Sequence, residues 1–241
     1  MNGNGPGRPS ASFIIPARNE EQYILRAVGS VLAQSAGDMR LECIVVDNGS
    51  TDGTVARLSS LAEVQSGKVR LVDEPRAGIG RAKNAGAAVA IADTFIFLDA
   101  DSWAAPNLAI EVQRARSMGM QAGSIRVVAD GGSRIDRMFF ALMELGKVRF
   151  GVRAQMLFAD AALFRELHGF DPDLRLGEDV DFLTRAAHAL KDRGQPAPCH
   201  VTRSEIATSV RRLESAHHWG MATMFGRWAL AYAGIGRRRP Y

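Results

Sequence analysis

The chain has 241 residues, of which 46% are hydrophobic and 23% are charged, and these values predict one globular domain with its own core. Its formal net charge is +4, and its two cysteines, Cys43 and Cys199, exclude a disulfide scaffold and a zinc site built from cysteines. The sequence contains no apolar run of the ~18 residues that a membrane-spanning helix needs. Residues 1–10 lack the apolar stretch of a secretory signal, so we expect a flexible leader on a cytoplasmic protein.

The first half of the chain alternates short apolar runs with helical patterns. The expected strands are Ser12–Pro16, Leu41–Asp47, Val69–Asp73 and Thr94–Asp99, and the expected helices are Glu20–Gln34, Thr54–Glu63, Ile79–Ile91 and Ala105–Met118. Strands that are apolar at nearly every position are typical of parallel sheets covered by helices on both faces. The sequence therefore predicts an α/β fold, with a Rossmann-like, mostly parallel sheet in a single domain.

The chain after Gly119 is less regular, and we expect it to extend the same sheet. The expected strands are Gly123–Val128 and Ala154–Ala159, and the expected helices are Asp136–Val148, Ala161–His168 and Glu178–Leu190. No long linker interrupts the pattern, so we place one domain over residues 11–205, with halves at 11–118 and 119–205. The spacing of apolar residues from Thr208 to Leu230 predicts an amphipathic helix within a C-terminal segment, residues 206–241.

Positive charge is concentrated at the end of the chain. From Lys191 to Tyr241 there are nine Lys and Arg residues against three Asp and Glu, and Arg237–Arg239 stand almost at the terminus. A basic tail favours an anionic partner such as a phosphate or a lipid surface, and a solvated end without a partner is the alternative. Peripheral contact with the inner face of a membrane is one interpretation; packing of this segment against the domain is the other. We expect no nucleic-acid partner.

Carboxylates stand where two of the expected strands end. Asp47 ends one strand, and Asp99 ends another and is followed by Asp101. Ligands of open parallel α/β sheets bind at the carboxyl ends of the strands, although Asp also ends strands simply as a turn residue. Two carboxylates that face the same side suit a hard divalent cation, which completes its coordination with water and substrate phosphates. We therefore expect Mg²⁺ or Mn²⁺ and a diphosphate-bearing substrate.

The segment Arg76–Asn84 combines two glycines with a helix start and cations. Such a helix start favours anions, with Arg81 and Lys83 close by. It does not match the dinucleotide-binding fingerprint, because Lys83 stands at the third glycine position. The sequence also has no phosphate-binding loop of the kinase or NTPase type.

A third group of acids, Glu178, Asp179 and Asp181, begins an expected helix. Acids in a first helical turn are favoured by the helix dipole, so a structural role is one interpretation. A general base that removes the proton from an incoming hydroxyl is the other, since a displacement at a diphosphate needs one.

Four segments in this order resemble the motifs of family 2 glycosyltransferases, which have the GT-A fold. Phe13–Glu21 resembles the opening strand and loop, Ile44–Thr54 the second-strand motif, and Phe97–Asp101 the Asp-x-Asp metal motif. Gly169–Asp171 and Gly177–Phe182 resemble the acceptor-side motif with its catalytic acid. The resemblance runs from about residue 12 to about residue 190.

The resemblance implies inverting transfer of one sugar from a nucleoside diphosphate sugar, a UDP-sugar by family frequency, to an acceptor hydroxyl. Residues 11–118 would hold the nucleotide sugar and residues 119–205 the acceptor. Asp179 would be the general base with Glu178 beside it, and Asp101, with Asp99, would ligate the metal. The other residues implied at the nucleotide-sugar pocket are Pro16, Arg18, Glu20, Asp47 (toward the base), Gly49, Arg81, Lys83, Asp99 and Ala100. Lys83 stands where many relatives have Arg, and the Gln-x-x-Arg-Trp motif of processive members is absent from the sequence.

Two alternatives remain at this point. A sugar nucleotidyltransferase shares the strand-end acids and the metal, but it normally has a glycine-rich loop where this chain has Ala17–Glu20. A non-catalytic sugar-nucleotide-binding relative would have less reason to retain Asp101 and Asp179. His217 or His200 is a candidate third metal ligand, with an ordinary surface or core histidine as the simpler interpretation. The sequence does not identify the sugar or the acceptor.

Overall fold

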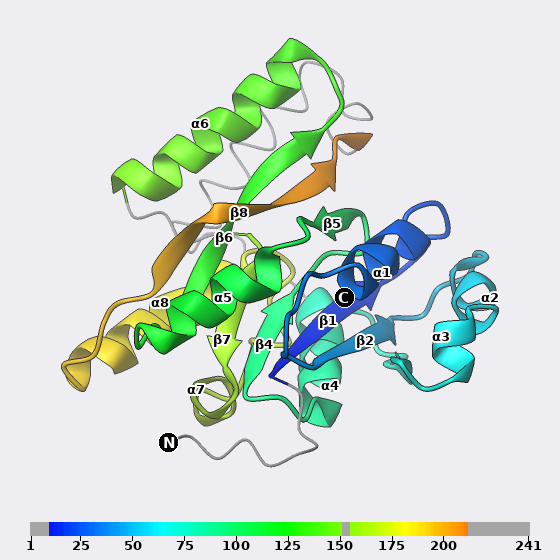
Figure 1. The fold of residues 1–241 in the computed structure, drawn as a ribbon, viewed down its shortest axis with the longest axis horizontal. Coiled ribbons are helices and arrows are strands. Elements are labelled where there is room, and N and C mark those ends of the chain that lie inside the picture. Colours follow the sequence, from blue (N-terminus) through cyan, green and yellow to red (C-terminus); the bar gives the residue numbers. More distant parts are fainter. Residues whose placement is uncertain (1–9, 151–154, 212–241) are drawn as a thin grey trace.

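The computed structural model describes residues 10–150 and 155–211. Strands and helices alternate up to about residue 118, as predicted (Figure 1). The strands there are β1 Ala11–Ala17, β2 Leu41–Asp47, β3 Val69–Asp73, β4 Thr94–Phe97 and β5 Ser102–Ala104, and the helices are α1 Ile24–Leu32, α2 Thr54–Ser59, α3 Ala62–Gln65, α4 Ile79–Val89 and α5 Leu108–Ser117. The expected helix Thr54–Glu63 is thus two short helices, and β5 was not predicted.

The second half of the described chain contains long elements of both kinds. They are β6 Ala122–Asp130, α6 Arg134–Phe150, β7 Leu157–Asp160, α7 Ala161–Glu166, α8 Glu178–Asp192 and β8 Cys199–Ser209. β8 was not predicted; it crosses the expected boundary between residues 205 and 206. Thr208 and Ser209 are strand residues, so the helix expected from Thr208 does not begin there, and its continuation beyond residue 211 lies outside the described residues.

The described strands form one sheet in the order β3-β2-β1-β4-β7-β6-β8-β5. β3, β2, β1 and β4 are parallel, β7 is antiparallel to β4 and β6, and β8 is parallel to β6. The sheet curls, since β5 at its far end packs against α1 beside β1. The predicted α/β fold with a single, mostly parallel sheet is confirmed.

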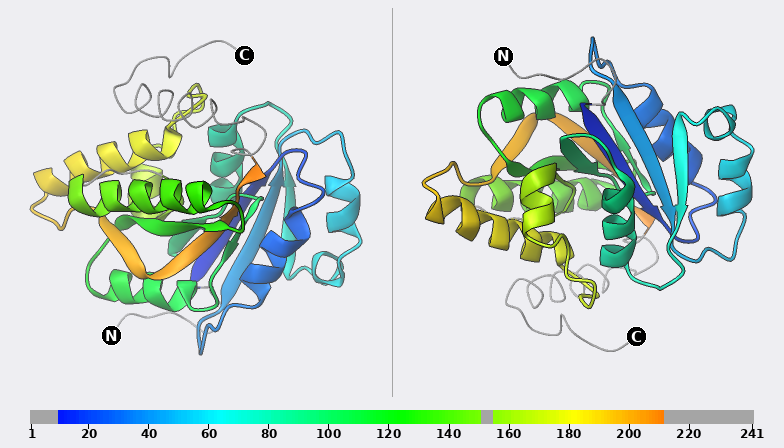
Figure 2. Two further views of the ribbon diagram at one scale, coloured as in Figure 1. Left: turned by 90° about the horizontal axis from the view of Figure 1, so that it is seen from above. Right: turned by 90° about the horizontal axis from the view of Figure 1, so that it is seen from below.

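Helices cover both faces of the sheet (Figure 2). Successive residues of β1 enter two different cores: Phe13 and Ile15 pack with α1, α5 and α6, whereas Ile14 packs with α4, α7 and α8. This double burial explains why β1 is apolar without alternation. Within the described residues, no helix is long and apolar enough to cross a membrane.

Candidate active site

The strands β1, β2 and β4 end at the same edge of the sheet. Their parallel register places Ala17 beside Asp47, and Ile14 beside Phe97. The backbone N–H of Leu98 continues this pairing, donating to the carbonyl oxygen of Ile14 at 3.0 Å. The loops that follow β1, β2 and β4 therefore emerge together, which is the location expected for a ligand site in such a sheet.

A cavity of about 240 Å³ opens between these loops. Five residues predicted from the sequence line it. They come from the end of β1, the loop after β1 and the segment after β4: Pro16, Arg18, Glu20, Asp99 and Ala100. The cavity also has walls that the sequence did not indicate: Ala17, Asn48, Gly78, Ile79, Ala82 and Arg175. Arg18 and Arg175 bring cationic side chains to it from opposite halves of the chain.

Asn48 fixes the shape of this cavity. Its Nδ2 donates to the carbonyl oxygens of Glu74 at 2.7 Å and Arg76 at 2.9 Å, and its Oδ1 accepts from the N–H of Gly78 at 2.9 Å. Gly78 has φ 146°, which side-chain-bearing residues rarely adopt, and α4 begins directly after it. Asn48 therefore sets where α4 starts. Its position next to the strand-end Asp47 was the only sequence signal for this role.

Asp47 and Gly49 form the turn at the end of β2. The Asp47 carboxylate accepts hydrogen bonds from the Ser50 N–H at 3.2 and 3.3 Å, and Gly49 has φ +76°. This is the turn role that the sequence left open as an alternative. Neither residue lines the cavity, so a contact between Asp47 and a nucleotide base stays a prediction.

Asp101 is 4% exposed and has a cationic partner that the sequence did not reveal. Arg211 Nη2 lies 3.1 Å from Asp101 Oδ2, and the same guanidinium contacts the Glu20 carboxylate and lies over the Tyr23 ring. β8 delivers Arg211 to this place, because the Ser209 N–H donates to the Asp101 carbonyl oxygen at 3.0 Å. Since β8 was not predicted, the pairing could not be foreseen.

Lys83 connects the two acid motifs. Its Nζ donates to Glu178 Oε1 at 2.7 Å, and both side chains are buried. Burial alone would lower the Lys83 pKa, but the carboxylates of Glu178, Asp99 and Asp179 raise it overall. Burial likewise opposes ionisation of Glu178, yet Lys83 lowers its pKa. Lys83 therefore stays charged between the segment after β4 and the start of α8.

Asp179 has the electrostatics of a proton acceptor. Burial, followed by the charge of Glu178, raises its pKa to about 6, against the opposing effects of Lys83 and two backbone N–H groups. Those donors are Val180 at 2.8 Å and Gln155. The Gln155 side-chain Oε1 is buried and has no hydrogen-bond partner among the described residues. A carboxylate with a pKa near neutrality suits general-base chemistry.

Two other predicted residues, Arg81 and His200, have partners of their own. Arg81 pairs with Asp173 at 2.9 Å, in the segment before α8. Both ring nitrogens of His200 are engaged, one with Ser124 Oγ and the other with Glu144 Oε2, each at 2.9 Å. No ring nitrogen of His200 is therefore left for a metal ion. His217 lies outside the described residues.

The donors around Asp101 suit a hard cation completed by a substrate. Across residues 10–150 and 155–211, no group of three or more His, Cys, Asp or Glu side chains could hold a metal ion. Magnesium commonly takes one or two protein carboxylates and draws its other ligands from phosphates and water. The residues Asp99 and Asp101 fit that pattern, and Arg211 shows that a positive charge is stabilised at Asp101.

Comparison with known proteins gives the family of the chain. The model of the family "Glycosyl transferase family 2" matches residues 12–137, just over half of the chain. This chain belongs to that family, as the sequence motifs predicted.

A curated relative also extends the match beyond residue 137. The succinoglycan biosynthesis protein ExoO of Rhizobium meliloti (strain 1021) is 30% identical over 202 residues, which cover 74% of this chain and 56% of ExoO. The chain thus spans just over half the length of that relative.

Solved structures share the fold. The mannosyltransferase PcManGT from Pyrobaculum calidifontis, in complex with GDP-Man and Mn²⁺, superposes with a TM-score of 0.65 at 22% identity, covering 92% of this chain and 65% of that one. S. aureus TarS 1-349 in complex with UDP-GlcNAc superposes with a TM-score of 0.61 at 17% identity, covering 83% of this chain and 58% of that one. At these identities the likeness concerns the fold, and it confirms the predicted GT-A architecture.

Proposed function

We propose that this protein is a glycosyltransferase that moves one sugar from a nucleoside diphosphate sugar to an acceptor hydroxyl with inversion at the anomeric carbon. The observation that carries the proposal is the buried Lys83, held by Glu178 and in the field of both Asp99 and Asp179. This shared cation supports a single site in which the expected metal motif and the expected base motif act together. Family membership supports the same reaction class.

The donor would bind in the cavity at the edge of the sheet. Arg18 and Arg175 on its wall suit a diphosphate, and the N-terminus of α4, whose first residues Ile79 and Ala82 line the cavity, favours negative charge. Asp47, which precedes the cavity-lining Asn48, would contact the base. The bound nucleotides of TarS and PcManGT, UDP-GlcNAc and GDP-Man, support this donor class, with a UDP-sugar our preferred donor here.

Asp101, with Asp99, would hold Mg²⁺ or Mn²⁺. The ion, when bound, neutralises negative charge on the departing diphosphate. This chain's own part is to keep the carboxylates ionised and oriented. Before the donor arrives, Arg211 balances the buried Asp101 and Glu20, so neither carboxylate is left as an uncompensated buried charge.

Asp179 would accept the proton of the acceptor hydroxyl. The two backbone N–H groups that it accepts from fix the orientation of its carboxylate. The acceptor oxygen would then attack the anomeric carbon from the side opposite the diphosphate, which inverts the configuration. The Oε1 of Gln155, which has no hydrogen-bond partner among the described residues, would accept from a second hydroxyl of the incoming sugar or alcohol.

Calorimetric titration of UDP, GDP and their sugars, with and without Mn²⁺, tests the donor and metal assignments together. We expect nucleotide affinity to rise at least ~10-fold with Mn²⁺ in the natural chain and not to change in Asp101→Asn. Asp38→Asn, an exposed carboxylate elsewhere, is the matched control. Nucleotide affinity that is independent of Mn²⁺ would contradict the metal assignment, and failure of all nucleotides to bind would contradict the donor class.

The two alternatives predict different products. A sugar nucleotidyltransferase would release pyrophosphate from a nucleoside triphosphate and a sugar phosphate, whereas a glycosyltransferase releases a nucleoside diphosphate. A non-catalytic relative would bind the donor and release nothing. Chromatography of the nucleotide pool separates the three after incubation either with a nucleoside diphosphate sugar and candidate acceptor alcohols, or with a nucleoside triphosphate and a sugar phosphate. Membrane contact through the C-terminal tail, whose residues lie outside the described range, stays a prediction.

A further inference from the structure

Helix α6 carries a row of exposed apolar side chains. Ile135, Met138, Leu142, Leu145 and Val148 are 42%, 66%, 55%, 57% and 65% exposed, respectively. Their spacing of three and four residues places them on one side of the helix. The opposite side, with Phe139, Phe140 and Met143, is buried in the core. α6 lies at the periphery of the molecule alongside β6 and β8 (Figure 1), and we call its exposed row the α6 stripe.

The charges on the same side of α6 are all positive. Among the α6 residues whose exposure the structure describes, the exposed ones are Arg134, Ile135, Arg137, Met138, Ala141, Leu142, Leu145, Val148 and Arg149. None is a carboxylate. The two acids of the helix are engaged elsewhere: Asp136 accepts from Ser133 at the helix start, and Glu144 pairs with Lys147 and His200 on the inner side.

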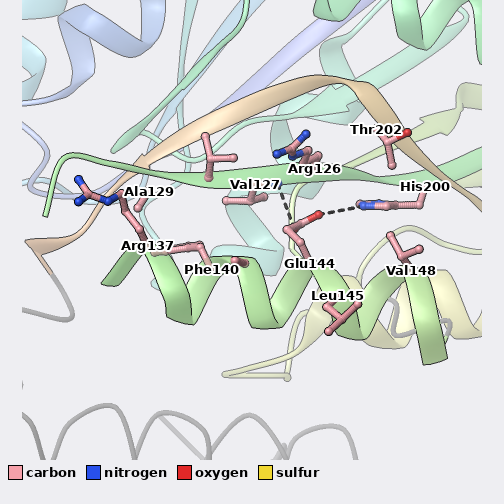
Figure 3. Close-up of a pocket in the computed structure, with 12 residues that line it drawn as sticks. Arg126, Val127, Ala129, Arg137, Phe140, Glu144, Leu145, Val148, His200 and Thr202 are labelled. Atoms are coloured by element: carbon pink, nitrogen blue, oxygen red, sulfur yellow. Dashed lines mark hydrogen bonds and ion pairs between the residues drawn. The ribbon is translucent and has the colours of Figure 1, made fainter. Parts of the chain in front are cut away.

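The α6 stripe continues into a groove. A cavity of about 540 Å³ lies between α6 and the strands β6 and β8, and it is lined by Leu145 and Val148 of the stripe and by Arg137 (Figure 3). Val127, Ala129 and Phe140 give it apolar walls, and the hydrogen bond between Glu144 and His200 closes one side. The apolar surface therefore extends beyond the convex side of the helix.

From this geometry we propose that α6 docks on an anionic lipid bilayer. A helix that is apolar on both sides needs a cover on each. The exposed Arg134 and Arg137 lie on the outer side of α6, where the described residues of the helix include no exposed carboxylate, so they favour a cover that is also negatively charged. A second copy of this surface would bring arginines against arginines. The chain after residue 211, with Arg212, Arg227 and Arg237–Arg239 against Glu214, is likewise positive. An anionic membrane interface supplies both apolar depth and negative charge.

Docking through α6 would bring the second half of the site to the bilayer. α6 ends at Phe150, and Gln155, five residues later, donates its backbone N–H to the candidate base Asp179. Lys147, near the end of α6, is close enough to Asp179 for its pKa to be affected by that carboxylate. The inference thus goes beyond the proposed function, because it orients the acceptor side of the molecule toward the membrane.

Vesicle sedimentation of the full chain tests this proposal without any donor or turnover. We use vesicles of phosphatidylcholine alone and vesicles that contain phosphatidylglycerol as well. We expect binding only to the anionic vesicles, at least ~10-fold weaker in Leu142→Gln/Leu145→Gln and about fivefold weaker for each of Arg134→Gln and Arg137→Gln. Because these side chains are exposed, the thermal midpoint of each variant should match that of the natural chain.

Exposed apolar residues elsewhere give the matched control. Ile91→Gln and Met118→Gln, at 51% and 69% exposure, should sediment like the natural chain. The proposal is overturned if the natural chain ignores anionic vesicles, or if binding survives Leu142→Gln/Leu145→Gln but not Arg237→Gln/Arg238→Gln/Arg239→Gln. It is also overturned if the double Leu variant lowers the thermal midpoint, which would mean that protein covers the stripe, or if it converts a dimer to a monomer in analytical ultracentrifugation. Since no nucleotide is present, these results are independent of whether sugar transfer occurs.

Discussion

The N-terminal half (residues 11–118) and the C-terminal half (residues 119–211) contribute to one site by different physical means. In the N-terminal half, hydrogen bonds between side chains and backbone groups lock the loops after β1 and β2 to each other. Asn19 Oδ1 accepts from the Thr51 N–H at 2.8 Å, and the Glu20 N–H donates to Thr54 Oγ1 at 2.8 Å. Asn48 does the same for the loop before α4.

The C-terminal half contributes the partners of buried ion pairs. Glu178 pairs with Lys83 across the two halves, and Lys147 pairs with Glu144 in the interior. A neutral hydrogen bond contributes about 1 kcal/mol, whereas breaking a buried ion pair costs about 3–5 kcal/mol. The difference implies that substitutions at the neutral hydrogen bonds of the N-terminal loops act through loop shape and donor affinity. Substitutions at the buried charges that join the two halves, or at Asp179, should act on chemistry and on stability, and with larger effects.

The largest expected effect is loss of turnover in Asp179→Asn. The amide cannot accept the hydroxyl proton, so we expect kcat to fall by about 10²–10⁴-fold while the Kd for the nucleotide donor stays within about twofold. Steady-state kinetics and calorimetry measure the two quantities separately. Asp181→Asn, two residues further along α8, is the control and should keep most of the activity. If Asp179→Asn were as active as the natural chain, Asp179 would not be the proton acceptor.

Lys83→Met should lower the free energy of unfolding by about 3–5 kcal/mol. The substitution leaves Glu178 buried without its cation, and a single buried charge is far more costly than the intact pair. Urea unfolding followed by circular dichroism gives the free energy. Adding Glu178→Gln should restore most of the stability, because the uncompensated charge is then gone. If the single and double variants are equally unstable, the two side chains stabilise the fold through packing rather than through charge.

Asn48→Ala should lower the free energy of unfolding by about 1–3 kcal/mol. It leaves the Gly78 N–H and the carbonyl of Glu74 without their partner, and buried unpaired groups carry that cost. We also expect weaker donor binding, because the cavity wall at Gly78 and Ile79 loses its anchor. Asn107 is an exposed asparagine that donates to the Arg203 carbonyl at 3.2 Å and accepts from Ser204 Oγ at 2.8 Å. Asn107→Ala is the control and should cost less, because it leaves one backbone group without its partner rather than three. Unchanged stability and donor affinity would show that the loop before α4 needs no side-chain anchor.

The smallest effect is the pH dependence of turnover. Because the pKa of Asp179 is raised to about 6 and the unprotonated form is the active one, the rate should rise with pH, reach a plateau above about 7, and fall about tenfold per pH unit well below 6. A kcat profile from pH 4.5 to 8.5 measures it. The residual activity of Asp179→Asn should lack this limb. A profile that falls as pH rises through 6 would mean that the protonated carboxyl is the active form.

The sequence was most informative where one residue pattern has a single local meaning. The continuous apolar run Phe13–Ile15 predicted a buried strand, and the structure buries it on both faces. The acids Asp99 and Asp101, after another such strand, indicated the ligand edge of the sheet. The order of motifs also indicated the family that the comparisons bear out. Strand register then follows from parallel packing, so the shared edge of Asp47 and Asp99 was predictable.

Tertiary structure alone decided which charges meet. Arg211 reaches Asp101 because β8 returns along the curled sheet, and Lys83 reaches Glu178 because α4 and α8 cover the same face. Such pairs join residues about a hundred positions apart, and no local propensity encodes them. It was likewise the packing of α6 that turned one of its apolar sides outward. Local pattern fixes which backbone elements form, but the electrostatic partners of a buried carboxylate depend on every element that folds against it.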